Sequence, residues 1–194
     1  MRLTSSALAA FGALALTGCI SLGPDTPDQL LTLTPTASIP DGAASEGEAS
    51  AALAVQTPSV QQRLNVPRIP VTTSDSTLAY LEDAVWVEKP ADLFRNLLSE
   101  TIRAKGNRLV VAGGELEYVA ATQLSGSLVA MDYDAVTSSA VVRYDAVLEL
   151  PGGRILTRRF EERVSGIAPE ATAVGAALND AANNVADQVA EWVG

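Results

Sequence analysis

The sequence contains no histidine and only one cysteine among its 194 residues. Without histidine no Ser-His-Asp or Cys-His catalytic unit can form, and a zinc site of the usual histidine type is excluded. A single cysteine also leaves no partner for an intrachain disulfide. Basic residues are scarce as well, because 13 Lys and Arg stand against 23 Asp and Glu, for a net charge of -10. Nucleic acid needs clustered basic residues, so we expect no nucleic-acid partner.

The N-terminus has the form of a secretory signal peptide. A basic residue, Arg2, precedes an uncharged and mainly apolar stretch over residues 7–16. This stretch is too short to span a bilayer, which takes about 20 residues of helix. No other segment approaches that length. The sequence therefore predicts an exported chain without a transmembrane helix.

The apolar stretch ends in Leu16-Thr17-Gly18-Cys19, which resembles a bacterial lipobox. In such signals the cysteine thiol receives a diacylglyceryl group, the peptide is cut before it, and the new amino group is usually acylated, for example with palmitate. Several acyl chains at one residue anchor a protein stably, whereas one chain gives marginal binding. We therefore expect residues 1–18 to be a lipoprotein signal peptide and Cys19 to be the lipidation site. The alternative is an ordinary cysteine near a plain cleavage site.

The mature chain would be held at the membrane by its lipid alone. Removal of residues 1–18 leaves 12 basic and 23 acidic residues, and a body this acidic is repelled by anionic lipid. Ile20 follows the cysteine, whereas the usual sorting rule for retention in the inner membrane requires Asp there. We therefore expect the periplasmic face of the cell envelope, with the outer membrane favoured over the inner membrane.

The first part of the mature chain differs in composition from the rest. Residues 20–62 hold five acidic residues and five prolines, but no Lys, Arg or aromatic residue. Such a segment buries too little apolar surface to offset its chain entropy. Two short apolar runs, Gln29–Leu33 and Leu53–Gln56, could each add a strand. We therefore predict a leader over residues 19–55 and a folded domain over residues 56–194.

The domain alternates extended and helical patterns. Residues 63–73 carry two prolines and favour an edge strand or an extended segment, and residues 77–88 are predicted to be extended. Pro90–Lys105 is predicted as a helix, with Pro in its first turn, Asp92 at its positive end and basic residues before Gly106.

Four strands and a second helix are expected to follow. The helix, over about residues 169–192, has one apolar stripe, which indicates packing on the sheet or, alternatively, a partner. The fold class is thus α+β, a mixed and mostly antiparallel sheet packed by two amphipathic helices in a single domain. The strands are expected at residues 108–111, 123–133, 140–150 and 154–164, the last two joined as a hairpin by Pro151-Gly152-Gly153.

Paired carboxylates are the only candidates for acid–base chemistry. Glu115 and Glu117 form one pair, and Asp132 and Asp134 another. Residues two apart on a strand point the same way, so each pair could converge as in a glycosidase. Such pairs are more often solvated strand ends, and we expect no enzyme activity, catalytic residue, cofactor or metal.

The predicted strand over residues 154–164 carries charges of both signs. Arg158, Arg159 and Arg163 stand against Glu161 and Glu162. This pattern is typical of a solvated edge strand, and the alternative is an edge that pairs with a partner chain.

Four pieces, in this order, resemble the ABC-type transport auxiliary lipoprotein family. They are Leu30–Pro35, Val66–Val71, Ala84–Pro90 with the helix that follows, and Ala190–Val193. Leu31 stands where the family has an aromatic residue, and residues 73–75 replace a compact Asp-x-Pro. The third and fourth pieces contain Trp86 and Trp192, respectively. We expect each tryptophan to be a core residue or a partner contact.

The resemblance implies an accessory role without chemistry. Such lipoproteins serve transporters with mammalian-cell-entry (MCE) domains, which move phospholipids or other hydrophobic molecules between the inner and outer membranes. The expected partners are the MCE-domain protein and the ABC permease and ATPase complex, with a homo-oligomer as a further option. This sequence has no phosphate-binding loop of its own. The alternatives are a structural or assembly lipoprotein without a role in transport, and an envelope enzyme such as a peptidoglycan hydrolase.

Overall fold

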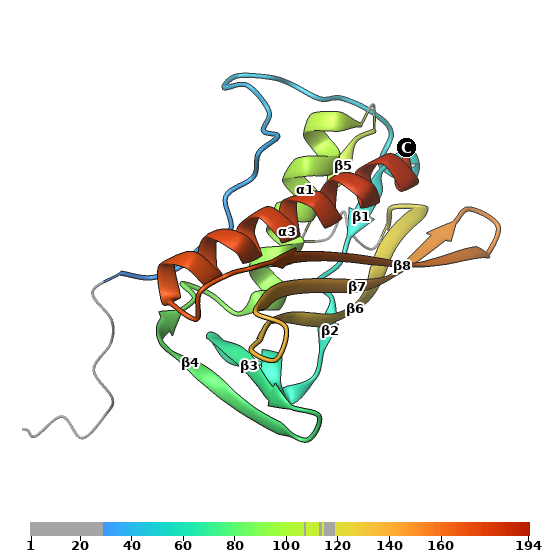
Figure 1. The fold of residues 1–194 in the computed structure, drawn as a ribbon. Coiled ribbons are helices and arrows are strands. Elements are labelled where there is room, and N and C mark those ends of the chain that lie inside the picture. The colour runs from blue at the N-terminus through green and yellow to red at the C-terminus, as the bar shows by residue number, and fades with distance from the viewer. Residues whose placement is uncertain (1–28, 107, 113, 115–118) are drawn as a thin grey trace, which may run out of the picture.

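The computed structural model describes residues 29–106, 108–112, 114 and 119–194 (Figure 1). Cys19, Glu115 and Glu117 lie outside the described residues. In the described ranges no helix combines the length and apolar character needed to cross a membrane.

Strand β6 (Thr122–Asp134) forms the centre of an eight-stranded sheet. It pairs antiparallel with β7 (Ser139–Leu150), which pairs antiparallel with β8 (Arg154–Ser165). The β7–β8 hairpin turns at residues 151–153, as the sequence predicts. Buried positions alternate with less buried ones from Val142 to Glu149 of β7, which explains why this part of the sheet was predictable.

The opposite edge of β6 pairs with three short strands, which are all parallel to β6 and occupy successive stretches along its length. These are β1 (Leu53–Val55), β2 (Ser59–Val60) and β3 (Arg68–Ser74). Two strands complete the sheet, since β4 (Thr77–Val85) pairs antiparallel with β3 and β5 (Val110–Val111) pairs parallel with β1. The long ladders are antiparallel and the short ones mostly parallel, which confirms the expected fold class.

Of the two alternatives for residues 63–73, the edge strand is wrong, and the extended backbone holds for β3. Strand β3 lies between β4 and β6, and β4 is the edge. Proline is tolerated in β3 because its parallel contact with β6 runs through only Val71 and Thr72, so Pro70 need not donate to that ladder. Residues 62–64 form a short 3-10 helix, η2 (Gln62–Leu64), rather than part of a strand. A second one, η1 (Ala49–Ala51), precedes β1.

Two helices cover the same face of the sheet (Figure 1). Helix α1 (Pro90–Lys105) has the predicted bounds, with Pro90 in its first turn. Helix α3 (Ala171–Val193) buries the predicted apolar stripe against the sheet and against α1. Phe94 of α1 meets Tyr144 of β7 edge-on, with ring centroids 5.3 Å apart.

The folded part begins before the expected boundary at residue 56. All three residues of β1 are fully buried, and β1 lies between β5 and β6. Further upstream, Leu33 is buried and Leu31 packs against the same core. A three-residue strand has little intrinsic preference for its structure, so its neighbours in the sheet, rather than its composition, stabilise it.

Candidate functional site: the strap and the open face of the sheet

An extended segment that we call the strap, residues 31–39, lies across the helical layer (Figure 1). It begins at a single bridge beside Trp86, where the Leu31 amide donates to the Val85 carbonyl and the Val87 amide donates to the Leu31 carbonyl, each at 2.8 Å. The strand expected over residues 29–33 is therefore reduced to one paired residue. The Leu31 side chain fills the space that glycine leaves at position 175, because a Cβ there would lie 2.8 Å from Leu31 Cδ2.

Two asparagines of α3, which we call the asparagine clamp, hold the strap by its backbone. The Asn179 Oδ1 accepts a hydrogen bond from the Thr34 amide at 2.7 Å. Asn183 makes two such bonds, since its Oδ1 accepts from the Thr36 amide at 2.8 Å and its Nδ2 donates to the Thr34 carbonyl at 3.0 Å. Residues four apart on a helix share a face, so both amides reach the same segment. Asn183 is only 3% exposed, which makes these bonds hard for water to replace.

The strap is also fixed to the other helix. The Ile39 amide donates to the Glu100 carboxylate of α1 at 3.0 Å. The strap thus joins α1, α3 and the end of β4 into one unit. Sequence reasoning missed this arrangement, although two asparagines at a spacing of four residues next to the apolar stripe of α3 were a usable signal.

The second feature is the face of β6, β7 and β8 turned away from the helices, which we call the open face. Arginines and carboxylates of the described residues meet on this face in five ion pairs. Arg143–Glu161 at 2.5 Å and Arg159–Asp145 at 2.6 Å join residues directly opposite one another on β7 and β8. The others are Arg63–Asp132, Arg163–Asp134 at 3.4 Å and Arg163–Glu161 at 3.9 Å.

Asp132 and Asp134, the carboxylate pair that could have converged on one site, have different surroundings. Burial raises the pKa of Asp132, and its ion pair with Arg63 opposes that shift. A hydrogen bond from the Thr137 hydroxyl at 2.7 Å lowers the pKa of Asp134, which also accepts the backbone amides of the β6–β7 turn. The buried Asp132 is therefore balanced by the partly exposed Arg63, and Asp134 holds a turn, so the two do not form an acid–base pair.

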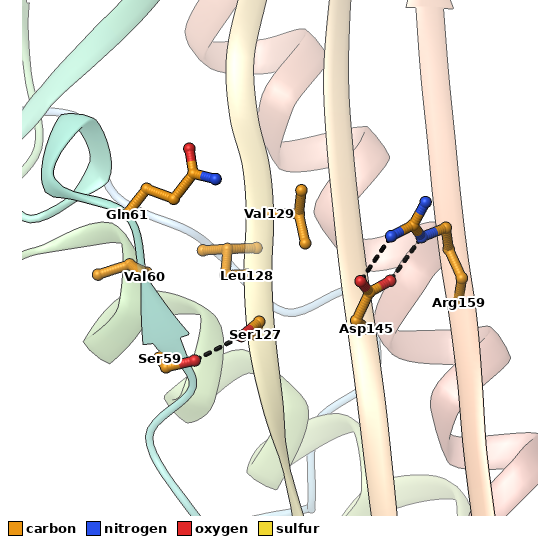
Figure 2. A pocket seen from close by; sticks show the side chains of 8 residues that line it. All are labelled: Ser59, Val60, Gln61, Ser127, Leu128, Val129, Asp145 and Arg159. Carbon is orange, nitrogen blue, oxygen red and sulfur yellow. Dashed lines mark hydrogen bonds and ion pairs between the residues drawn. The ribbon is translucent and has the colours of Figure 1, made fainter.

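Shallow cavities lie on the open face between these side chains. Figure 2 shows one of about 400 Å³, to which β2, β6, β7 and β8 contribute. Two of its lining residues, Ser59 and Ser127, share a 2.5 Å hydrogen bond between their hydroxyls, and two others form the bidentate Arg159–Asp145 pair. A smaller cavity of about 200 Å³ adjoins Arg63 and Asp132. Polar and apolar groups line the larger cavity about equally, whereas polar and charged groups dominate the smaller one, which suits contact with a polar protein surface.

The remaining candidates have mainly structural surroundings. Trp86 is 1% exposed and belongs to the core, and Trp192 packs edge-on against Phe160 at 5.6 Å while part of it stays accessible. Arg158, Arg159 and Arg163 lie on β8, an edge strand as expected. Over the described part of the chain no three His, Cys, Asp or Glu residues are grouped as a metal site would require.

Fold and site together define an α+β domain that is fastened to its own N-terminal segment and presents a charged sheet face. The chain belongs to the family described as ABC-type transport auxiliary lipoprotein component, whose family model matches residues 31–190. The resemblance seen in the sequence is thereby confirmed. The family is a transport auxiliary component associated with an ABC transporter and, as a lipoprotein family, with the cell envelope. The match begins at Leu31, the first residue of the strap.

Two solved structures share the fold at low sequence identity. Protein XCC0632 from Xanthomonas campestris is 20% identical over 85% of this chain and 94% of its own, with a TM-score of 0.70. An uncharacterized protein is 12% identical over 86% and 100%, with a TM-score of 0.66. PelC from Paraburkholderia phytofirmans, crystallised as a dodecamer, is 13% identical with a TM-score of 0.44, over 75% of this chain and 92% of its own. A comparison with curated protein sequences gives no match.

Proposed function

We propose that this protein is the lipid-anchored accessory subunit of an ABC transporter that works with an MCE-domain protein. It tethers the periplasmic part of that transporter to a membrane, the outer membrane being favoured by Ile20, while phospholipid or another hydrophobic molecule passes between the two membranes. The family match over residues 31–190 is the observation that carries the proposal. The ATPase carries out the catalysis, and this chain positions the transporter relative to the membrane.

The strap supports a tethering role because it fixes where the anchor joins the body. Eleven residues lie between Cys19 and Leu31. Fully extended, the chain from Cys19 to Leu31 spans at most roughly 40 Å. With lipid on Cys19, the end of the domain that carries Leu31 and Trp86 stays within that distance of the bilayer. Force on the anchor would act on the clamp and on the bridge beside Trp86, not on the loop that follows residue 39.

The open face supports docking of the periplasmic partner. Its arginines and carboxylates are paired within the chain, so they are already oriented when a partner arrives. Charge patterns of this kind set the register and specificity of an interface more than its affinity. The shallow cavities between them can receive side chains of a partner surface.

The test separates anchoring from docking in a deletion strain. Three chains are expressed at native level, namely the unaltered protein, Cys19→Ala behind a conventional cleavage site, and a chain with Arg159→Glu and Arg143→Glu on the open face. We expect only the first to restore full resistance to detergent and to co-purify with an MCE-domain protein, a permease and an ATPase. The second should complement partially, and better on overexpression, because loss of the anchor lowers its concentration at the membrane.

Two outcomes would count against the proposal. Full complementation by the soluble Cys19→Ala chain at native level would reject tethering. Absence of transporter chains from the purified unaltered protein would favour the structural or assembly lipoprotein instead. Immunoblots for equal abundance and circular dichroism of the open-face variant serve as controls.

A further inference from the structure

The outer edge of β8 is a twelve-residue strand that, within the described residues, has a ladder partner only in β7. Figure 1 shows it along the rim of the sheet below α3. An edge of this length presents a row of backbone amides and carbonyls that can pair with another strand. Ile155 near its start is 59% exposed.

Charges on the two faces of β8 differ in their partners. On the open face, Arg159 and Glu161 are paired with Asp145 and Arg143. On the helix-covered face, the Arg158 guanidinium lies over the Phe160 ring at 4.9 Å. Neither Arg158 nor Glu162 is in an ion pair with any described residue. Four residues of strand separate the two by roughly 13 Å, so they cannot pair within one chain.

We propose that β8 pairs antiparallel with β8 of a second copy of this chain, with the two-fold axis at Phe160. A residue that precedes Phe160 by a given number of positions then lies opposite the residue of the second copy that follows Phe160 by the same number. Residues opposite one another in such a pair project from the same face of the combined sheet. Arg158 of each copy lies opposite Glu162 of the other, and Leu156 opposite Val164. On the open face Arg159 lies opposite Glu161. The two charges that form no ion pair with any described residue of their own chain thus form ion pairs with each other in the dimer.

Neighbouring registers lack this complementarity. An axis at Glu161 places Glu161 opposite itself and Arg159 opposite Arg163, and an axis at Arg159 places that arginine opposite itself. Like charges directly opposite one another destabilise a ladder. The axis at Phe160 is thus selected by charge, and it also brings the accessible part of Trp192, which packs on Phe160, toward the dimer centre. The proposal does not depend on which transporter the protein serves.

Charge exchange across the axis gives a direct test. Two differently tagged copies of the full-length lipoprotein are co-expressed, solubilised in detergent and purified through one tag. Arg158→Glu alone places Glu opposite Glu, and Glu162→Arg alone places Arg opposite Arg. We expect each single variant to co-purify with itself about tenfold less than the unaltered chain, a change equivalent to about 1.4 kcal/mol.

The rescue combinations identify the partner as a second copy in this register. Arg158→Glu on one tagged chain should pair with Glu162→Arg on the other, and the chain with both changes should pair with itself. Arg154→Glu, a charge reversal on the same strand, is the matched control. The position opposite Arg154 in the second copy lies beyond the end of β8, so this variant should co-purify like the unaltered chain. Thermal melts establish that each single variant is folded.

Three results would overturn the proposal. Unaltered chains that fail to co-purify would make the β8 edge a solvated one. Equal co-purification of all combinations would place any self-association elsewhere. Loss in both single variants without recovery in the mixed pair would point to a different chain as the occupant of this edge.

Discussion

Among the ion pairs of the open face, Arg63–Asp132 is the least exposed to solvent. The Asp132 side chain is 8% exposed and that of Arg63 is 25% exposed, so neither group is fully hydrated. Arg63 also donates to the Val129 carbonyl at 2.8 Å, beside the irregular step of β6. The pair thus joins η2 to the middle of the sheet. Removing one partner of such a pair costs more than the pair contributes, because the other charge stays buried.

Arg63→Met should lower the free energy of unfolding at pH 7 by about 2 kcal/mol. Burial already raises the pKa of Asp132, and loss of the arginine raises it further. A folded-state pKa above that of the unfolded chain means that protonation favours the fold. The deficit should therefore shrink as the pH falls through the raised pKa of Asp132.

Urea unfolding of Arg63→Met and the unaltered protein, at pH 7 and at successively lower pH, checks this expectation. The double variant Arg63→Met with Asp132→Asn is the control, since it removes the buried charge and should lose the pH-dependent part of the deficit. A deficit of the same size at every pH would show that Arg63 acts through packing alone.

At the scale of elements, the strap behaves as an added layer on the helices rather than as a strand of the sheet. Within the strap only Leu31 makes a β-bridge, to Trp86 just after β4, and the rest of the strap is held by side-chain amides of α3 and a carboxylate of α1. Leu33 contributes apolar burial to the same contact. The strap is therefore sensitive to α3, an element about 140 residues away in the sequence.

Asn183→Ala should release the strap and reduce the free energy of unfolding by about 2 kcal/mol, since it removes bonds to both Thr34 and Thr36. Asn184→Ala, the neighbouring position with an exposed side chain, is the matched control. Amide hydrogen exchange at Thr36, whose amide donates to Asn183, should accelerate in the first variant alone. Equal protection in both variants would show that the clamp contributes little to holding the strap.

At the scale of the whole molecule, β6 assembles strands from distant parts of the chain. Its antiparallel side is local in sequence, whereas its parallel side collects β1, β2 and β3 from residues 53–74. Helix α3 then closes the core from the C-terminal end and carries the clamp for the strap. The domain is complete only when the strap and β1 are in place.

A chain beginning at residue 29 should fold and melt cooperatively, and one beginning at residue 56 should not. The shorter chain loses β1, whose three residues are fully buried between β5 and β6, together with Leu31 and Leu33. Near-ultraviolet circular dichroism and thermal melts of the two chains make the comparison. If both chains unfold in the same cooperative transition, the folded domain begins at residue 56, as the sequence predicts.

The sequence alone determined the elements that local patterns specify. The helix Pro90–Lys105 was predictable because its proline, its terminal charges and its apolar stripe all lie within one short segment. The β7–β8 hairpin was predictable because the alternating strand patterns and the Pro-Gly-Gly turn follow one another directly in the sequence. The order of short motifs was enough to indicate the family. The α+β class followed from the sum of these elements.

Only the tertiary structure decided the contacts between segments that are far apart. The position of β3 inside the sheet, the burial of β1 and the ion pair of Arg63 with Asp132 each join residues whose own neighbours give no sign of the partner. The same holds for Asn183 and the strap. A local pattern reports the period of a helix or strand, whereas such contacts depend on which surfaces the completed core brings together.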